Sequence, residues 1–263
     1  MYGVNVPEVD PARSVRLLWG VAAPTGRRGP RPGLDLRGVV DAAVALADAE
    51  GLEAVTVRRL AADLGVAPMT LYGYVPGRTD LLDLMVDRVQ LAMPRPPWGR
   101  AGWRTRVRRV AEANRDLLRA HPWVARLPST RPALGPGLMA KYEHELAAFA
   151  GAGLDDADTD AALTHVLGVV RALALAEQDA EATRIGSGLD EQQWWAAAGP
   201  VLAEVVDPAA YPLATRIGTA VGAAQGAAYD PDRAWAFGLE RVLAALDGLV
   251  ATSHPTPGGQ RRR

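Results

Sequence analysis

The segment from Val55 to Val75 constrains the fold more than any other part of the sequence. Thr56 can cap a helix whose apolar residues recur every three or four positions, and Gly65 can supply the positive φ of a tight turn. A second helix, expected over about 67–74, has Pro68 in its first turn, where a missing amide is tolerated. The pattern predicts two short helices joined by a sharp turn.

Small and apolar side chains are placed to close the core of this turn. Ala61 allows the two helices to approach closely, and the expected core consists of Leu60, Leu64, Val66 and Leu71. The outer face of the second helix is then free to enter a DNA major groove. A helix-turn-helix can also be a purely structural corner, so the outward side chains decide between the two interpretations.

Side chains on the outward face favour DNA binding. The threonine and tyrosine hydroxyls there can reach phosphates, and amides at the helix start can meet a phosphate. Arg58, on the preceding helix, can donate two hydrogen bonds to a guanine. The predicted contact face comprises Arg58, Pro68, Met69, Thr70, Tyr72 and Tyr74.

Helical spacing of apolar residues recurs along the rest of the chain. One helix begins at Asp35 and stops at Gly51, and a fourth is expected at 78–91. Further helical stripes lie at about 100–120, 136–150, 157–181, 190–206 and 231–251. Strand alternation is nowhere convincing, and the stretch from Pro208 to Gly226 receives no assignment. The fold class is therefore all-α.

Prolines divide the chain into two domains flanked by irregular ends. Pro94, Pro96 and Pro97 mark a boundary near 93–99. We expect a flexible basic arm at 1–34, with a short turn or helix at 14–19. A helix-turn-helix domain at 35–92, a larger helical domain at 93–251 and a disordered tail at 252–263 follow. Arg27, Arg28 and Arg31 suit a DNA minor groove, the alternative being a disordered solubilising tail.

Composition and motifs narrow the function classes. The chain has no cysteine, a net charge of −1 and no apolar run of membrane-spanning length. Charged residues stand where a signal peptide would have its apolar core, namely Glu8, Asp10, Arg13 and Arg16. We therefore expect a soluble cytoplasmic protein. No phosphate loop, dinucleotide fingerprint or nucleophile elbow is present, so an enzyme is not predicted. His121, His144, His165 and His254 show no metal-ligand spacing, and neither a metal nor a cofactor is predicted.

The stretch from about Arg37 to Val89 resembles the tetracycline-repressor (TetR) family. The resemblance rests on Ala42-Ala43, Ala47 to Leu52, Thr56 to Val66, Met69 to Tyr72, Val75 to Arg78 and Leu81 to Met85. The second domain resembles the family's C-terminal domain through Trp98, Trp103, His121 to Trp123, Arg131 to Gly137 and Phe237 to Leu239. The family commonly has histidine and lysine where Tyr74 and Arg78 stand.

The resemblance implies a larger α-helical domain for ligand binding and dimerisation. It also implies an operator-binding homodimer paired through the helices at about 157–181 and 231–251, and it adds Arg78 to the DNA contacts. The helix at 157–181 is apolar on most of its surface, which requires a cover on most sides. That cover is either a partner chain or, as the alternative, the protein's own core.

A ligand cavity among the helices at 100–181 is implied by the resemblance. The candidate ligand residues are Trp103, His121, Trp123, Met139, Tyr142, His165, Arg171, Trp194 and Trp195, each of which could instead serve packing. The expected function is a repressor that binds palindromic operator DNA and releases it when a small molecule binds, through the helix at 78–91. The alternatives are a regulator without a small-molecule effector and an activator.

Overall fold

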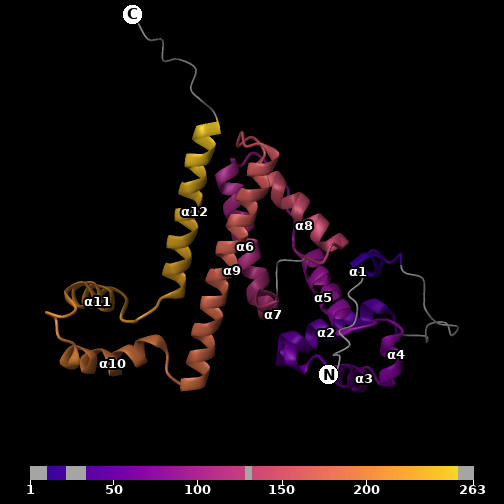
Figure 1. Cartoon of the computed structure of the whole chain (residues 1–263), viewed down its shortest axis with the longest axis horizontal. Coiled ribbons are helices and arrows are strands. Elements are labelled where there is room, and N and C mark those ends of the chain that lie inside the picture. Colours follow the sequence, from indigo (N-terminus) through magenta and orange to yellow (C-terminus); the bar gives the residue numbers. More distant parts are fainter. Residues whose placement is uncertain (1–10, 22–33, 128–131, 254–263) are drawn as a thin grey trace, which may run out of the picture. The chain divides into compact units, whose positions relative to one another are not determined.

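The computed structural model describes residues 11–21, 34–127 and 132–253, and all regular structure within these ranges is helical (Figure 1). The predicted all-α fold class is confirmed. The chain divides into two compact units, residues 1–163 and 164–263. The predicted boundary near 93–99 does not separate these units, because α5 packs along α8 and the junction of α6 and α7 joins the core of the N-terminal helices.

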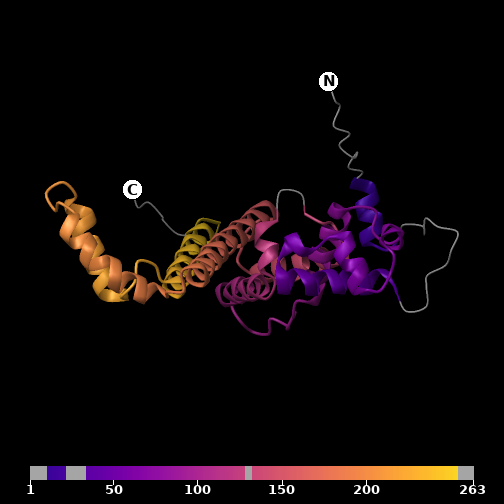
Figure 2. The same cartoon turned by 90° about the horizontal axis from the view of Figure 1, so that it is seen from below.

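The first unit contains a helix-turn-helix domain and the helices packed on it. Its elements are α1 (Pro11–Leu18), α2 (Leu36–Glu50), η1 (Leu52–Ala54), α3 (Val57–Asp63), α4 (Pro68–Tyr72), α5 (Arg78–Ala92), α6 (Trp103–Ala120), α7 (Pro122–Arg126), α8 (Pro136–Leu146), η2 (Ala147–Phe149) and the start of α9 (Asp156–Ser187). Figure 2 shows α2 to α5 gathered into one cluster. The helix-turn-helix expected from the sequence is thus α3 and α4, with α4 shorter than predicted.

Local chemistry explains the ends of these helices. Thr56 Oγ1 accepts a hydrogen bond from the Arg59 amide at 3.2 Å, which is the predicted cap of α3. Gly65 has a φ of +64°, a value that side chains with a Cβ rarely adopt, so glycine is required at this turn. Arg59 bridges Glu50 and Asp63, with its Nε 3.0 Å from Asp63 and its Nη2 2.7 Å from Glu50.

One continuous core holds α2 to α5 together. Leu60, Ala61, Leu71 and Met85 are all buried in it, and Leu64 and Val66 pack against its edge. Trp123, from α7, and Leu117, from α6, belong to the same core. The predicted small core of the turn is therefore confirmed, and it extends into the helices that follow the proline-rich linker.

Helix α1 occupies part of the segment expected to be a flexible arm. It covers the short apolar stretch in which a turn or helix was considered, and it packs against α5. Arg13 and Ser14 donate hydrogen bonds to the Asp80 carboxylate at 3.2 and 3.3 Å, and Trp19 Nε1 donates to the Leu134 carbonyl at 2.8 Å. Leu17 and Leu18 cover the domain core, which accounts for the ordering of this segment.

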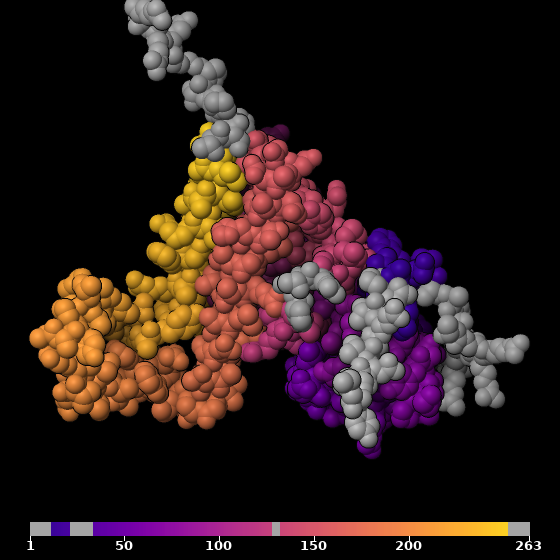
Figure 3. Space-filling model, viewed as in Figure 1, coloured from indigo at the N-terminus to yellow at the C-terminus, as the bar shows by residue number. Residues whose placement is uncertain are grey.

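The second unit consists of the rest of α9 with α10 (Glu191–Val205), α11 (Pro212–Gln225) and α12 (Pro231–Ser253). Helix α11 lies in the stretch from Pro208 to Gly226, to which no structure was assigned from the sequence. Neither α10 nor α11 contains a buried residue, and Figure 3 shows the two helices (orange) as an exposed lobe. A Cβ at Gly238 of α12 would lie 2.9 Å from Leu173 Cδ1 of α9, so these helices approach closely there.

Among the helices of the described residues, only α9 is long enough and apolar enough, by length and composition alone, to cross a membrane. Core helices of soluble proteins pass the same test. Val166, Val170 and Ala174 of α9 are buried and Arg171 lies among them in the sequence, whereas most residues of its most apolar stretch are not buried.

Candidate nucleic-acid interface and effector pocket

The outward face of the helix-turn-helix carries the exposed side chains that the sequence assigned to it. Met69 and Tyr72, which lie three residues apart on α4, are 76% and 47% exposed. Arg58 on α3 is exposed, and we find no hydrogen bond or ion pair to it within the described part of the chain. Pro68 is exposed and Thr70 half-buried. The structure thus brings five predicted contact residues onto two adjacent short helices.

Two further predicted contacts have partners inside the protein. The Tyr74 hydroxyl donates to the Leu34 carbonyl at 3.0 Å. The Arg78 guanidinium donates to the carbonyls of Val55 and Leu52 at 3.0 and 3.2 Å. These bonds connect the helix-turn-helix to the start of α2 and to the start of α5. Arg27, Arg28 and Arg31 lie outside the described residues.

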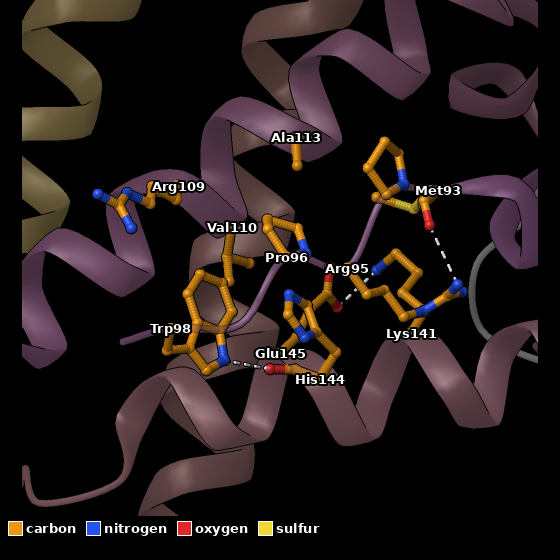
Figure 4. Close-up of a pocket in the computed structure, with 11 residues that line it drawn as sticks. Met93, Arg95, Pro96, Trp98, Arg109, Val110, Ala113, Lys141, His144 and Glu145 are labelled. Atoms are coloured by element: carbon orange, nitrogen blue, oxygen red, sulfur yellow. Dashed lines mark hydrogen bonds and ion pairs between the residues drawn. The ribbon is translucent and has the colours of Figure 1, made fainter. Parts of the chain in front are cut away.

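A pocket of about 380 Å³, including space open to solvent, lies between the proline-rich linker, α6 and α8 (Figure 4). Its wall is mainly apolar, and its lining includes Met93, Pro94, Arg95, Pro96, Trp98, Arg109, Val110, Ala113, Lys141, His144 and Glu145. The Trp98 and His144 rings stack with centroids 4.3 Å apart, and Trp98 Nε1 donates to the His144 carbonyl at 3.2 Å. The pocket therefore has a flat aromatic side.

Three buried polar side chains at the pocket, Lys141, Glu145 and Asn114, are paired with one another. Lys141 Nζ lies 2.6 Å from Glu145 Oε2, and both side chains are buried. Asn114 donates to the other oxygen of Glu145 and to the Val110 carbonyl. Burial lowers the pKa of His144, and the nearby positive charge of Arg95 lowers it further. The imidazole is consequently neutral at pH 7.

None of the predicted ligand residues lines this pocket. Trp103 is half-buried at the start of α6, Met139 and Tyr142 are exposed on α8, and the Tyr142 hydroxyl donates to Asp160 at 2.7 Å. His165, Arg171, Trp194 and Trp195 belong to the other compact unit. Aromatic and histidine content alone does not tell which helix faces meet, and the ligand residues named from the sequence stay a prediction.

His121 and Trp123 instead contact the DNA-binding domain. Trp123 Nε1 donates to Asp48 Oδ1 of α2 at 2.7 Å, and His121 Nδ1 lies 2.8 Å from the same oxygen. The pair connects α2 to the junction of α6 and α7. Two sequence signals could have found the pocket: a lone asparagine, Asn114, in the apolar stripe of α6, and the i,i+4 pair of Lys141 and Glu145.

A metal site is not formed among the residues that the structure describes, since no three histidine, aspartate or glutamate side chains come together there.

Comparisons with known proteins match both parts of the chain. Residues 39–85 match the family model of bacterial regulatory proteins, tetR family, and residues 94–251 match the tetracyclin repressor-like C-terminal domain. The chain is 38% identical over 247 residues to the HTH-type transcriptional repressor DrrR1 of Streptomyces coeruleorubidus, a match that covers 92% of the chain and 87% of that protein.

Solved structures show the same likeness. Apo ActR from Streptomyces coelicolor superposes with a TM-score of 0.67 at 26% identity, over 86% of this chain and all of ActR. ActR in complex with actinorhodin gives the same TM-score and identity over 88% of this chain and all of that chain. With its helix-turn-helix and its C-terminal helical domain both matched, this chain belongs to the TetR family of bacterial transcriptional regulators.

Proposed function

We propose that the protein is a cytoplasmic transcriptional repressor, without enzymatic activity, that binds palindromic operator DNA as a homodimer and releases it when a small molecule binds. The observation that carries the proposal is the exposed face of α3 and α4 on a closed helix-turn-helix core. Membership of the TetR family and the similarity to a repressor, DrrR1, give independent support.

The proposed DNA contacts divide into two groups. Arg58 and Tyr72, together with Pro68, Met69 and Thr70, meet the major groove, with Arg58 reading guanine. Tyr74 and Arg78 act mainly as positioning residues, because their hydrogen bonds to backbone carbonyls fix α4 and α5 in place. Arg27, Arg28 and Arg31 remain a proposed minor-groove contact.

The proposed dimer pairs α9 and α12 with the same helices of a second copy. Exposed small residues form a stripe on each helix, and these are Gly168 and Ala172 on α9 and Ala244 and Gly248 on α12. A Cβ built on Gly168 or Gly248 meets nothing within 4 Å, so each has open space beside it. The exposed apolar side chains of α10 and α11, which join these two helices in the chain, also favour a partner.

The pocket beside Trp98 is the proposed effector site. Its apolar wall and its stacked Trp98 and His144 rings suit a flat, largely apolar molecule. That ActR is solved in complex with actinorhodin shows that one structural relative binds a small molecule.

Selection of binding sites from random DNA with the purified full-length protein tests the proposal. We expect a palindromic sequence whose binding weakens steeply with salt. Arg58→Ala should weaken binding and relax the preference at one base pair by about 1–3 kcal/mol. Arg59→Ala is the matched control, since Arg59 is held by Glu50 and Asp63. Recovery of no enriched sequence would refute operator binding.

Regulation without an effector is the second candidate. It would be supported if small molecules that enter the pocket left operator affinity unchanged. Activation in place of repression would appear as a rise in reporter expression when the protein is bound at its operator.

A further inference from the structure

A buried carboxylate on α5 holds the beginning of α8. Asp87 is 6% exposed, and its Oδ1 accepts hydrogen bonds from the amides of Gly137 and Leu138 at 2.8 and 3.1 Å. These amides lie in the first turn of α8, where helix amides have no partner within the helix. A carboxylate at this end also meets the positive end of the helix dipole.

The backbones of the two helices lie close together at this point. A Cβ built on Gly135 would lie 2.3 Å from Asp87 Oδ1, and one built on Gly137 would lie 2.0 Å from the Asp87 carbonyl oxygen. Real Cβ atoms do not approach this closely, so only glycine fits while α5 and α8 keep their positions. The start of α8 is therefore held on α5 by both hydrogen bonds and shape.

The other half of α8 forms a wall of the pocket. Lys141, His144 and Glu145 line it, whereas the Asp87 contact lies at Gly137 and Leu138. Helix α8 has eleven residues and so spans only about 16 Å. If a helix this short moves as a rigid body, a displacement at His144 reaches the Asp87 contact.

Helix α5 connects this contact to the DNA-binding face. Its Leu84 and Met85 are buried in the helix-turn-helix core. At its first residue, Arg78 donates to the carbonyls of Val55 and Leu52, directly before α3. A shift of α5 therefore changes the position of α3 and α4.

A second contact fixes the same domain to a different helix. Asp48 of α2 accepts one hydrogen bond from Trp123 Nε1 and lies beside His121, at the junction of α6 and α7. The pocket lies between α6 and α8. If an occupant of the pocket separates α8 from α6, the Asp87 contact moves relative to the Asp48 contact, and the domain held at both points turns.

We infer that Asp87 is the positioning residue through which occupancy of the Trp98 pocket is transmitted to the helix-turn-helix. The inference rests on the proposed function, because it takes this pocket to be the effector site. Asp48 and Trp123 form the point about which the domain turns. The competing route is the linker itself, where Arg95 donates to the carbonyls of Gln90 and Met93 at the end of α5 and also lines the pocket.

A pocket-filling variant can stand in for the unidentified effector. Ala113 lines the pocket from α6 and does not touch Asp87, so Ala113→Leu adds apolar volume there. We would measure operator binding, by fluorescence anisotropy on the selected sequence, for the full-length wild type, Ala113→Leu, Asp87→Ala and the double variant. Amide hydrogen exchange across α5, from Leu84 to Val89, would be followed in the same four proteins.

With Asp87 present, Ala113→Leu should weaken operator binding by about 5- to 150-fold, the usual range of coupling between sites, and should speed exchange in α5. In the Asp87→Ala background both effects should fall to within about twofold. Asp87→Asn, which keeps an acceptor oxygen, should restore the coupling. Asp41→Ala is the matched control, since Asp41 pairs with Arg88, within the DNA-binding domain, and it should leave the coupling intact.

An equal effect of Ala113→Leu with and without Asp87 would overturn the inference in favour of the linker route. No effect of Ala113→Leu on either readout in the wild-type background would overturn it as well. If Asp87→Ala does not fold, Gly137→Ala, whose Cβ forces α8 away from α5, replaces it in the cycle. If the wild type binds no DNA, the proposed function fails, while hydrogen exchange still decides whether Asp87 couples the pocket to α5.

Discussion

The two compact units bury their apolar side chains to different extents. In the first unit, Leu60, Met85 and Val107 are at most 1% exposed. In the second unit, Val205 and Leu213 are 72% and 64% exposed, and neither α10 nor α11 has a buried residue. Apolar surface in water is unfavourable at about 25 cal/mol per Å². In the second unit α9 and α12 bury Val166 and Leu243, so the difference indicates that α10 and α11 have apolar surface available for a partner.

The largest effect should come from a charge placed on the open stripe of α9. A Cβ built on Gly168 meets nothing within 4 Å in one protomer, so Gly168→Arg should still fold with an unchanged circular dichroism spectrum. In the proposed dimer the arginine would be buried without a partner, and light scattering should detect monomers only. Operator affinity should fall with the dimer. Gly186→Arg, on the same helix beyond the proposed interface, is the control, and a Gly168→Arg dimer would place the interface elsewhere.

Truncation of a core residue in the first unit should have the next largest effect. Met85 is fully buried, and Met85→Ala should lower the free energy of unfolding by about 2–5 kcal/mol. Leu213→Ala, on exposed α11, should change it by less than about 0.5 kcal/mol at concentrations where the chain is monomeric. Urea denaturation measures both values, and similar losses would remove the contrast between the units.

Two glycine substitutions should change the stability of the protein in opposite directions. Gly137→Ala requires α5 and α8 to separate and should destabilise the protein by about 1–3 kcal/mol. Gly186→Ala, in the open second unit, meets no atom and should stabilise α9 by about 0.5–1 kcal/mol, since alanine favours helix. Thermal unfolding checks the signs, and a tolerated alanine at 137 would mean that α8 is not fixed to α5.

The smallest effect concerns pH. Burial raises the pKa of Asp87 above 3.8, although the amides of Leu138 and Gly137 lower it in part. The native state therefore holds this proton more tightly than the unfolded chain. Protonated Asp87 therefore contributes to stability at low pH, and this contribution is lost as pH rises from 3.8 through the raised native pKa. Each unit by which the native pKa exceeds the unfolded pKa corresponds to about 1.4 kcal/mol.

Asp87→Asn cannot ionise, so urea denaturation across this pH range should show wild-type stability declining relative to the variant. A wild-type stability that instead rises relative to Asp87→Asn would show that the amide bonds outweigh burial.

Local signals made the helix-turn-helix predictable from the sequence. Thr56, Gly65 and Pro68 each act within a few residues, and the structure confirms their places. The proposed contact face followed from the same periodicity. Helix α11 was not assigned, because its alanine- and glycine-rich sequence has no strong apolar stripe and its helix buries no residue. Helix α1 was underestimated, because its ordering comes from contacts with Asp80 and Leu134, which are distant in sequence.

Local sequence signals could not predict the pocket, nor the backbone carbonyls that accept hydrogen bonds from Tyr74 and Arg78. Tyr74 and Arg78 have polar groups that suit phosphate, and nothing local shows that the carbonyls of Leu34 and Val55 come within reach. The pocket depends on how the linker, α6 and α8 meet. Which face of each helix turns inward there is decided by packing over the whole first unit.

The close approach at Gly137 also has an evolutionary consequence. Any side chain at this position would collide with the backbone of Asp87, so the two positions are not free to drift independently. In the wider family, glycine at 137 should occur together with an acidic residue at 87, and a lineage that loses one should soon lose the other. The two residues could therefore serve as a marker that separates relatives in which α8 is hydrogen-bonded to α5 from relatives that lack this contact.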